Sequence, residues 1–502
     1  MFVGFPSPMK ALTIILLYNL RHTKPNSPPQ PSGALPILGH LHLLARQSPT
    51  HRTLSSLADK YGPIFSIRLG AHKAVVISAH EPVRDCFTTN DKILAFRPAS
   101  SVGLYLGYNY AGFGFTQGPY WREARKLVLH HLLSPRRLEK LKTAREAEIR
   151  SSFEELHAGG NFVIISKWFE ELSLDVIVKM ITGRRYTDTA RGKGGRPFRE
   201  VIKEFMYVSG QFVLSDAITF LPLRWVDFGG YIKAMKRISE ELDGITGKWV
   251  DEHLERGVKS DDERDFIDVM LSEIDERLLS FGHAKETIIK ATIQNLILAG
   301  SDTTSIHLTW TLSLLLNHPN VMQRAQYEID SNIGKNRWAQ ESDIPNLPYL
   351  QAVIKESLRL YPPGPISVPH EASQDCCIMG YKIPKGTRII VNLWKLHRDP
   401  RIWAQPEDFV PERFLAGHAG VDFNGQFYEF IPFGSGRRSC PGVTFAMQVA
   451  HLVLARLIQG FEIKTGLDKV VDMSEGMGIT LPKATPLEVV ITPRLANELY
   501  YS

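Results

Sequence analysis

Cysteine is scarce in this chain, and its scarcity excludes two common kinds of site. The 502 residues contain four cysteines, Cys86, Cys376, Cys377 and Cys440. Two of them are adjacent and no C-x-x-C pair exists, so the sequence predicts neither a disulfide framework nor a structural zinc site. Cys440 lies among glycines and arginines in "FGSGRRSCPG", residues 433–442, and therefore calls for a different chemistry.

Concentrated charge and long apolar runs are also lacking. The net charge of +6 is spread along the chain, without a basic block carrying interleaved aromatics, which argues against nucleic-acid binding. The first apolar stretch is clean only over 11–17, whereas a membrane-spanning helix needs about 20 apolar residues. We predict a weak membrane anchor in 1–20, with a disordered tail as the alternative, and a stiff proline-rich hinge in 21–44.

Helical periodicity dominates the rest of the chain, and strand-like alternation is short and scattered. Helical spacing of apolar residues runs through 136–158 and 443–461. Alternation is confined to four stretches, 64–70, 73–78, 387–394 and 486–493. Because no repeat or low-complexity tract interrupts residues 45–502, we predict one domain there, mainly α with small peripheral β-sheets.

The most unusual helix is predicted over 285–319, where it would be about 50 Å long. Its middle, "AGSDTT" (299–304), suits a helix interior poorly, since Gly300 costs about 1 kcal/mol and the polar side chains compete for backbone hydrogen bonds. In one interpretation Gly300 lets a flat cofactor or ligand approach, and Asp302 and Thr303 relay protons. In the other, the helix is simply kinked or broken here.

Two further motifs predict a charged triad. Glu356 and Arg359 lie three residues apart in "KESLRLYPP" (355–363), on one helical face. Such a pair is usually solvated and contributes little to stability. Arg413, in "PERF", offers a second arginine, and a buried carboxylate shared by both would not tolerate the loss of any member.

The surroundings of Cys440 favour a thiolate. Three glycines and two arginines flank it: Gly434, Gly436, Gly442, Arg437 and Arg438. The glycines permit positive φ and expose backbone N–H groups toward the sulfur, and the arginines add positive charge. A thiolate acts as a nucleophile, for which no base lies nearby in sequence although one could come from elsewhere, or as a metal ligand. As an axial ligand of haem iron it favours O–O cleavage.

In their order along the chain, these motifs resemble the cytochrome P-450 family. The cysteine motif has the family form F-x-x-G-x-R-x-C-x-G, matched at Phe433, Gly436, Arg438, Cys440 and Gly442. The resemblance covers residues 25–502. The segments "ATPLEVVITPRL", "PHEASQDC" and "VNLWKLHRDP" are similar to plant microsomal members, a group that includes nicotine demethylases, flavone hydroxylases, alkaloid hydroxylases and a homoterpene-forming enzyme.

The resemblance implies a role for each matching residue. Cys440 would be the proximal ligand of the iron of haem b (heme b), and Asp302 and Thr303 would deliver protons to bound dioxygen. Glu356, Arg359 and Arg413 would form a structural network behind the haem. The contacts to the cofactor would be Trp121, Arg125, His370, Phe433, Gly436, Arg438 and Gly442. For His370, a capping or surface role is an equally weighted alternative.

The substrate pocket is expected to be apolar and aromatic. By family position it would include Phe113, Phe115, Phe205, Phe212, Ala299, Ile366 and Ile479, some of which are alternatively core residues. We therefore expect insertion of one oxygen atom from O2 into a lipophilic plant specialised metabolite, by hydroxylation or N-demethylation of an aromatic or alkaloid substrate. The alternatives are terpenoid oxidation, C–C cleavage, an oxygen-independent isomerase and a non-catalytic haem-thiolate sensor. The Asp302–Thr303 pair favours monooxygenation.

A nucleotide-binding module is lacking as well. No G-x-G-x-x-G follows a predicted strand, so electrons must come from a separate protein. The resemblance implies the NADPH-cytochrome reductase of the endoplasmic reticulum, with cytochrome b5 as a second candidate partner. It also implies a location on the lipid bilayer of that organelle, with the catalytic domain facing the cytosol. The positive net charge would favour docking to an acidic face of the reductase.

Overall fold

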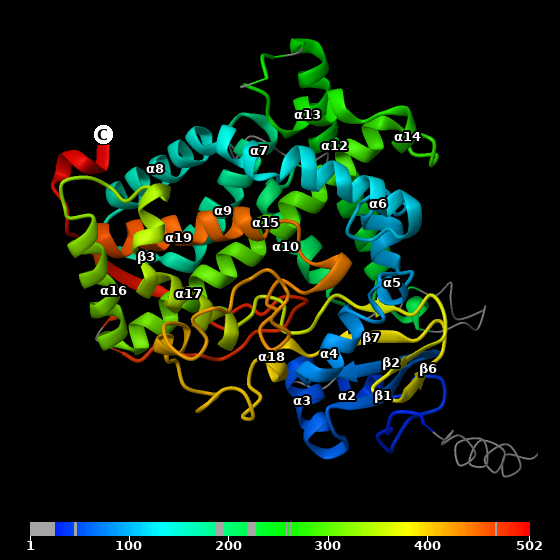
Figure 1. Ribbon diagram of the computed structural model, residues 1–502. Coiled ribbons are helices and arrows are strands. Elements are labelled where there is room, and N and C mark those ends of the chain that lie inside the picture. Colours follow the sequence, from blue (N-terminus) through cyan, green and yellow to red (C-terminus); the bar gives the residue numbers. More distant parts are fainter. Residues whose placement is uncertain are drawn as a thin grey trace, which may run out of the picture.

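A computed structural model shows a mainly helical protein with a small β-rich part at one side (Figure 1). The residues described are 26–44, 48–185, 195–211, 213–217, 227, 229–257, 259–261, 263–466 and 469–501. The predicted anchor, 1–20, and the candidate pocket residue Phe212 lie outside this set.

The described α-helices are α2 (Leu41–Leu44), α3 (Thr50–Tyr61), α4 (His80–Phe87), α5 (Asp91–Leu94), α6 (Gly118–Leu127), α7 (Pro135–Lys140), α8 (Lys142–Ala158), α9 (Ile165–Thr182), α10 (Phe198–Ser209), α12 (Tyr231–Arg256), α13 (Phe266–Glu273), α14 (Glu276–Leu279), α15 (Lys285–Asn317), α16 (Pro319–Asn332), α17 (Pro348–Leu360), α18 (Leu393–Leu396) and α19 (Val443–Gly460). Short 3-10 or π segments are η1 (Val102–Leu106), η2 (Val128–Leu132), η3 (Leu214–Asp216), η4 (Glu341–Asn346), η5 (Pro411–Phe414), η6 (Gly436–Arg438) and η8 (Asn497–Tyr501). The strands are β1 (Ile64–Leu69), β2 (His72–Ile77), β3 (Phe162–Ile164), β4 (His370–Glu371), β5 (Cys376–Ile378), β6 (Tyr381–Ile383), β7 (Arg388–Val391), β8 (Phe461–Lys464) and β9 (Glu488–Pro493).

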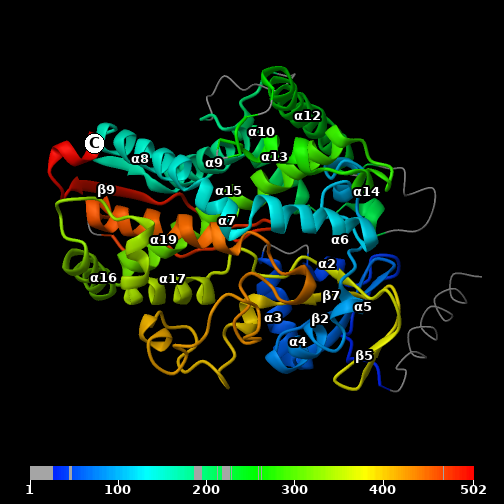
Figure 2. The same cartoon turned by 45° about the horizontal axis from the view of Figure 1, so that its top comes forward.

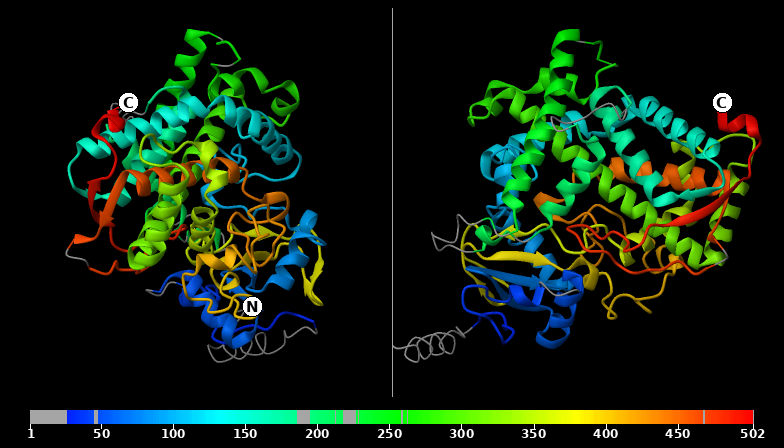
Figure 3. Two further views of the ribbon diagram at one scale, coloured as in Figure 1. Left: turned by 60° about the vertical axis from the view of Figure 1, so that its left-hand side comes forward. Right: turned by 180° about the vertical axis from the view of Figure 1, so that it is seen from behind.

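The strands form three small sheets. The largest has the order β1-β2-β7-β4, in which β2 and β7 are parallel and pair Ala74 with Arg388, while the other neighbours are antiparallel. The others have the orders β3-β9-β8 and β5-β6. In both views of Figure 3 the β1–β2 region stays at one end of the molecule. This arrangement confirms the predicted fold class.

Helix α15 runs through the helical part and contacts α9, α12, α17 and α19 (Figure 2). It is continuous from Lys285 to Asn317, so the alternative of a broken helix is excluded. The hydroxyls of its polar centre are satisfied within the helix, because Ser301 donates to the Ile297 carbonyl at 2.7 Å and Thr304 donates to the Gly300 carbonyl at 2.7 Å. These bonds return the competing polar groups to the helix backbone.

Two predicted elements differ in extent from the structure. The helical pattern over 136–158 is divided at Leu141 into α7 and α8, where Leu141 has φ −90° and ψ 3° and the Arg145 guanidinium donates to the Leu138 carbonyl at 3.1 Å. A continuous helix would use that carbonyl for the next turn. The alternation over 387–394 ends early at Val391, because the Asn392 side chain caps α18 by accepting a bond from the Lys395 N–H.

The described part of the predicted hinge, 26–44, lies against the domain. The Ser66 N–H donates to the Pro29 carbonyl at 2.8 Å, the Lys382 N–H donates to the Asn26 carbonyl at 2.7 Å, and Leu41–Leu44 forms α2. Through these bonds the segment is attached to β1 and β6 in the structure. A role as a membrane tether stays a prediction.

Candidate functional site

The loop 433–442 places the Cys440 thiol on the wall of a cavity of about 340 Å³. The Cys440 N–H donates to the Phe433 carbonyl at 2.8 Å, and the Gly442 N–H points to the sulfur at 3.3 Å. Gly436 has φ of 66°, and a Cβ added there would lie 2.4 Å from a carboxylate oxygen of Asp91. Both observations explain why glycine suits this position. Gly442 differs from the prediction, because its φ is −92° and it caps α19.

The charge around the thiol comes from a different arginine than expected. Arg437 pairs with Asp91 at 3.3 Å, and Arg438 donates to the Thr116 carbonyl at 2.6 Å. The nearby cation is Arg125, which donates to the Ser439 carbonyl at 2.6 Å. Burial raises the pKa of the Cys440 thiol, against the lowering effects of the Gly442 N–H and of Arg125. The arginine that lowers the pKa of the thiol is thus Arg125, whereas Arg437 and Arg438 of the loop have other partners.

Three partly buried arginines gather beside the cysteine loop. Arg438 lies over the Trp121 ring at 3.9 Å and Arg125 lies at 5.9 Å from it, and Arg97 donates to the Val368 and Pro369 carbonyls at 2.8 Å. Burial, then Arg97 and Arg125, lowers the pKa of Arg438 to about 8. Burial, then Arg125, lowers the pKa of Arg97 to about 10. Lowered values of this kind mark positive charges without a negative partner.

No described carboxylate pairs with Arg97, Arg125 or Arg438, and the Arg97 Nε atom is buried without a hydrogen-bond partner among the described residues. Arg97 and Arg438 line the cavity itself, whereas Trp121 packs against Arg438 and Arg125 donates to the Ser439 carbonyl. Since isolated buried charges are costly, this group is built to receive an anion.

His370 also lines the cavity and is buried. Its Nδ1–H donates to the Leu94 carbonyl at 2.8 Å, and burial, then Arg97, lowers its pKa to about 3. The ring is therefore neutral at physiological pH and adds no charge to the arginine group. The alternative of a surface histidine is excluded, while contact with a cofactor stays a prediction.

Adjacent residues of α15 face two different cavities. Thr303 and Ala299 line the Cys440 cavity, where the Thr303 hydroxyl donates to the Ala299 carbonyl at 2.5 Å. Asp302 lines a second cavity of about 250 Å³, beside Glu170 and Lys203 of α9 and α10. Its Oδ2 atom has no partner among the described residues, and burial raises its pKa to about 6. A carboxylic acid with this pKa can take up and release a proton near neutral pH.

The candidate pocket residues do not all line one cavity. Phe113, Ala299 and Ile366 line the Cys440 cavity, and Ile479 lines the second cavity. Phe115 packs near Gly103 and Gly107. Phe205 is 3% exposed in the core, because the amphipathic pattern of α10 turns its apolar face inward.

The predicted charged triad is assembled and buried. The Glu356 carboxylate accepts two bonds from Arg359, both at 2.8 Å, one from Arg413 at 2.9 Å and one from the Val410 N–H at 3.0 Å. Glu356 and Arg359 are both 0% exposed. This geometry excludes the alternative of a solvated surface pair.

Sequence reasoning missed two residues that line the Cys440 cavity, Arg97 and Asn295. A single arginine before a proline carries no spacing signal. Asn295, by contrast, interrupts an apolar stretch of α15, and a polar side chain at such a position is a signal that could have been used.

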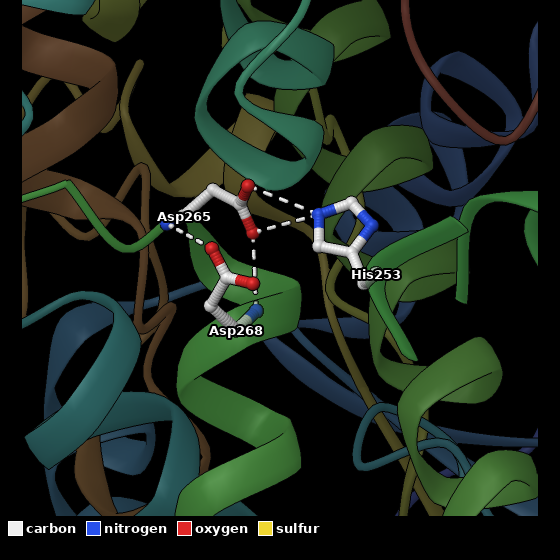
Figure 4. A group of neighbouring side chains, drawn as sticks. All are labelled: His253, Asp265 and Asp268. Carbon is white, nitrogen blue, oxygen red and sulfur yellow. Dashed lines mark hydrogen bonds and ion pairs between the residues drawn. The ribbon is translucent and has the colours of Figure 1, made fainter. Parts of the chain in front are cut away.

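A separate group between α12 and α13 has side chains that could bind a metal (Figure 4). Asp265 and Asp268 form a reciprocal cap at the start of α13. Both ring nitrogens of His253 face oxygen atoms, of Trp249 and Asp265, and Arg256 donates to both carboxylates. Although burial raises the pKa of Asp265, the bonds from His253 and Arg256 outweigh it and hold the pKa below its ordinary value. The group is thus an ion-paired helix cap.

Comparison with known proteins agrees with this geometry. The model of the cytochrome P-450 family matches residues 28–488. The chain belongs to this family. It is 46% identical over 500 residues to a nicotine N-demethylase from Nicotiana tomentosiformis, covering 96% of each chain, and 46% identical over 486 residues to a flavonoid-6-hydroxylase from Mentha piperita, covering 94% of each. A zebrafish cytochrome P-450 structure with progesterone has a TM-score of 0.75 at 28% identity, covering 89% of this chain and 100% of that one.

Family membership confirms the predicted fold, the monooxygenase class and haem iron as the cofactor. The cavity fits this cofactor by its chemistry. Haem carries two propionate carboxylates, which match the unpaired arginines, and its iron would take the proton-bearing thiol of Cys440 as a thiolate ligand. Metal coordination deprotonates a thiol outright, and so supplies the stabilisation that burial withholds.

Proposed function

We propose that this cytochrome P-450 inserts one oxygen atom into a lipophilic plant specialised metabolite, by hydroxylation or N-demethylation of an aromatic or alkaloid substrate. The observation that carries the proposal is the arrangement of one cavity. Cys440 lies on one wall, unpaired arginines lie at another edge, and Thr303 projects from α15. When bound, the haem supplies the activation of dioxygen, one atom of which enters the substrate while the other becomes water.

In this proposal Cys440 is the iron ligand, and the loop positions it. Arg97 and Arg438 would bind the propionates directly, with Arg125 and Trp121 supporting them from behind. His370, held by the Leu94 carbonyl, would add a neutral contact. The Glu356 triad would fix the protein behind the cofactor, as its burial and its bonds to both arginines support.

Protons would reach the cavity through the two neighbouring residues of α15. Asp302 would take protons from the second cavity, and the Thr303 hydroxyl, which donates to the Ala299 carbonyl, would have to rotate to pass a proton on in the Cys440 cavity. Because the two side chains face different cavities, transfer between them would need a bridging water or a rotation of one side chain. The raised pKa of Asp302, about 6, suits a group that must be protonated for part of each cycle.

The apolar composition of the cavity wall favours an apolar substrate. Phe113, Ala299 and Ile366 line it together with Leu133, Ile177 and Leu296. Apolar contact provides most of the affinity in such pockets, and a few polar groups set the orientation. The relatives named as a nicotine N-demethylase and a flavonoid-6-hydroxylase support an aromatic or alkaloid substrate.

Electrons would come from NADPH through a separate reductase, with cytochrome b5 as a second candidate partner. The net charge of +6 supports docking to an acidic partner. We also propose attachment to the endoplasmic reticulum, with the domain facing the cytosol. Among the described residues, α19 is the one helix long and apolar enough to span a bilayer, but 72% of it is buried within the protein, so it belongs to the core.

The test is the spectrum of the reduced protein with carbon monoxide. The haem-loaded chain is expected to absorb near the wavelength from which the family takes its name. Cys440→Ser should abolish that band, whereas Cys377→Ser, at an exposed thiol, should retain it. A Cys440→Ser variant with an unchanged band would overturn the assignment of the ligand. Spin-state shifts with alkaloids, flavonoids, terpenoids and fatty acids then test the substrate class, and a response to fatty acids alone would refute it.

A further inference from the structure

Asn295 is a buried amide in an otherwise apolar part of the cavity wall. It lies on α15 four residues before Ala299 and eight before Thr303, and is 8% exposed. Residues four and eight apart share a face of a helix, and all three line the Cys440 cavity. The helix rise places the amide about 12 Å along the axis from Thr303.

The orientation of this amide is determined by the loop that faces it. The Gly114 N–H donates to Asn295 Oδ1 at 2.8 Å, so the oxygen points to the loop and the NH2 group points away from that donor. The loop approaches closely because it has glycines at these positions. A Cβ added at Gly112 would lie 2.8 Å from Nδ2, and one added at Gly114 would lie 2.9 Å from Oδ1.

The two N–H donors on Asn295 Nδ2 have no acceptor among the described residues. The Nδ2 atom is nevertheless accessible from the cavity. The neighbouring hydroxyls differ, since Thr303 and Thr304 donate their protons to carbonyls of their own helix. When a ligand without an acceptor fills the cavity, these donors become buried and unpaired, which costs free energy. A ligand with an acceptor avoids this cost.

We propose that Asn295 sets substrate specificity by donating a hydrogen bond to a carbonyl or ether oxygen of the substrate. This inference rests on the proposed function and narrows its substrate class. The substrate would be a rigid aromatic molecule whose acceptor oxygen is remote from the carbon that is oxidised, because Asn295 lies about two helical turns from Thr303 on α15.

The test compares flavanone with flavan, which share one ring system and differ by the 4-carbonyl oxygen. Dissociation constants come from the spin-state shift of the haem-loaded protein. The wild type is expected to bind flavanone about tenfold more tightly than flavan. Asn295→Asp keeps an acceptor for the Gly114 N–H but replaces the donors by an oxygen. This variant should weaken the binding of flavanone about tenfold or more and change the dissociation constant of flavan by less than about threefold.

Asn295→Leu separates recognition from loop anchoring. If the amide only holds residues 112–114, Asn295→Asp should behave like the wild type and Asn295→Leu should weaken both ligands alike. Three results would overturn the inference. The first is that outcome, the second is equal binding of the two ligands by the wild type, and the third is no spin-state shift with either ligand. Intact carbon monoxide bands in these proteins would leave the proposed function standing, whereas a wild type without the band would overturn both.

Discussion

Replacing Asp302 by Asn is expected to stabilise the protein while impairing its chemistry. In the folded protein burial raises the pKa of Asp302 from 3.8 to about 6, against a lowering hydrogen bond from Thr480. A raised carboxyl pKa means that the folded state resists ionisation. The contribution of Asp302 to the free energy of unfolding is therefore fully present below its pKa in the unfolded state. It is lost as the pH rises through its pKa in the folded state. An amide has no such dependence.

The magnitude follows from the two pKa values. The raised pKa of Asp302 lowers the free energy of unfolding by about 1.6 kcal/mol at about pH 5 and by about 3 kcal/mol at about pH 7.5. The advantage of Asp302→Asn in the free energy of unfolding should thus grow by about 1.4 kcal/mol between these pH values. Residues that carry strained chemistry often lower stability in this way.

The assay is urea unfolding of the haem-loaded wild type and variant at both pH values, followed by circular dichroism. Ser301→Ala is the matched control, because Ser301 lies in the same cavity, is buried and bonds the Ile297 carbonyl, but carries no titratable group. Its effect should not depend on pH. A difference for Asp302→Asn that stays constant, or shrinks as the pH rises, would refute the assignment of a buried, raised-pKa carboxyl.

Two further predictions concern the triad and the hydroxyl. Glu356→Ala should cost about 3–5 kcal/mol of unfolding free energy, because two buried guanidiniums lose their carboxylate. Arg324→Gln, which breaks the exposed pair with Glu412, should cost about 0–1 kcal/mol in the same urea titration, and equal costs would contradict burial as the cause. Thr303→Ala, assayed with added reductase, should raise the hydrogen peroxide released per NADPH consumed. Thr309→Ala, whose hydroxyl bonds the Ser305 carbonyl away from the cavity, should not, and unchanged coupling in both variants would remove Thr303 from proton delivery.

Local chemistry made much of this protein predictable from its sequence. The loop around Cys440 requires glycines wherever it turns, and Gly436 does adopt the positive φ expected of it. The long helix was predictable because apolar residues recur along it, and its limits, Lys285 and Asn317, follow from its flanking residues. The Glu356–Arg359 pair was predictable because three-residue spacing places both on one helical face.

What the sequence by itself determined were the features whose causes lie within one segment: the cysteine loop, the polar centre of α15 and the paired charges. The tertiary structure alone decided which segments meet. Arg125 reaches the loop through Ser439, 314 residues away, and Arg97 joins it with no spacing signal. It also decided direction, because adjacent residues of a helix point about 100° apart. Whether Asp302 and Thr303 share a cavity therefore depends on what packs against each face of the helix. The packing of α9 and α10 against α15 gives each of the two residues a separate cavity.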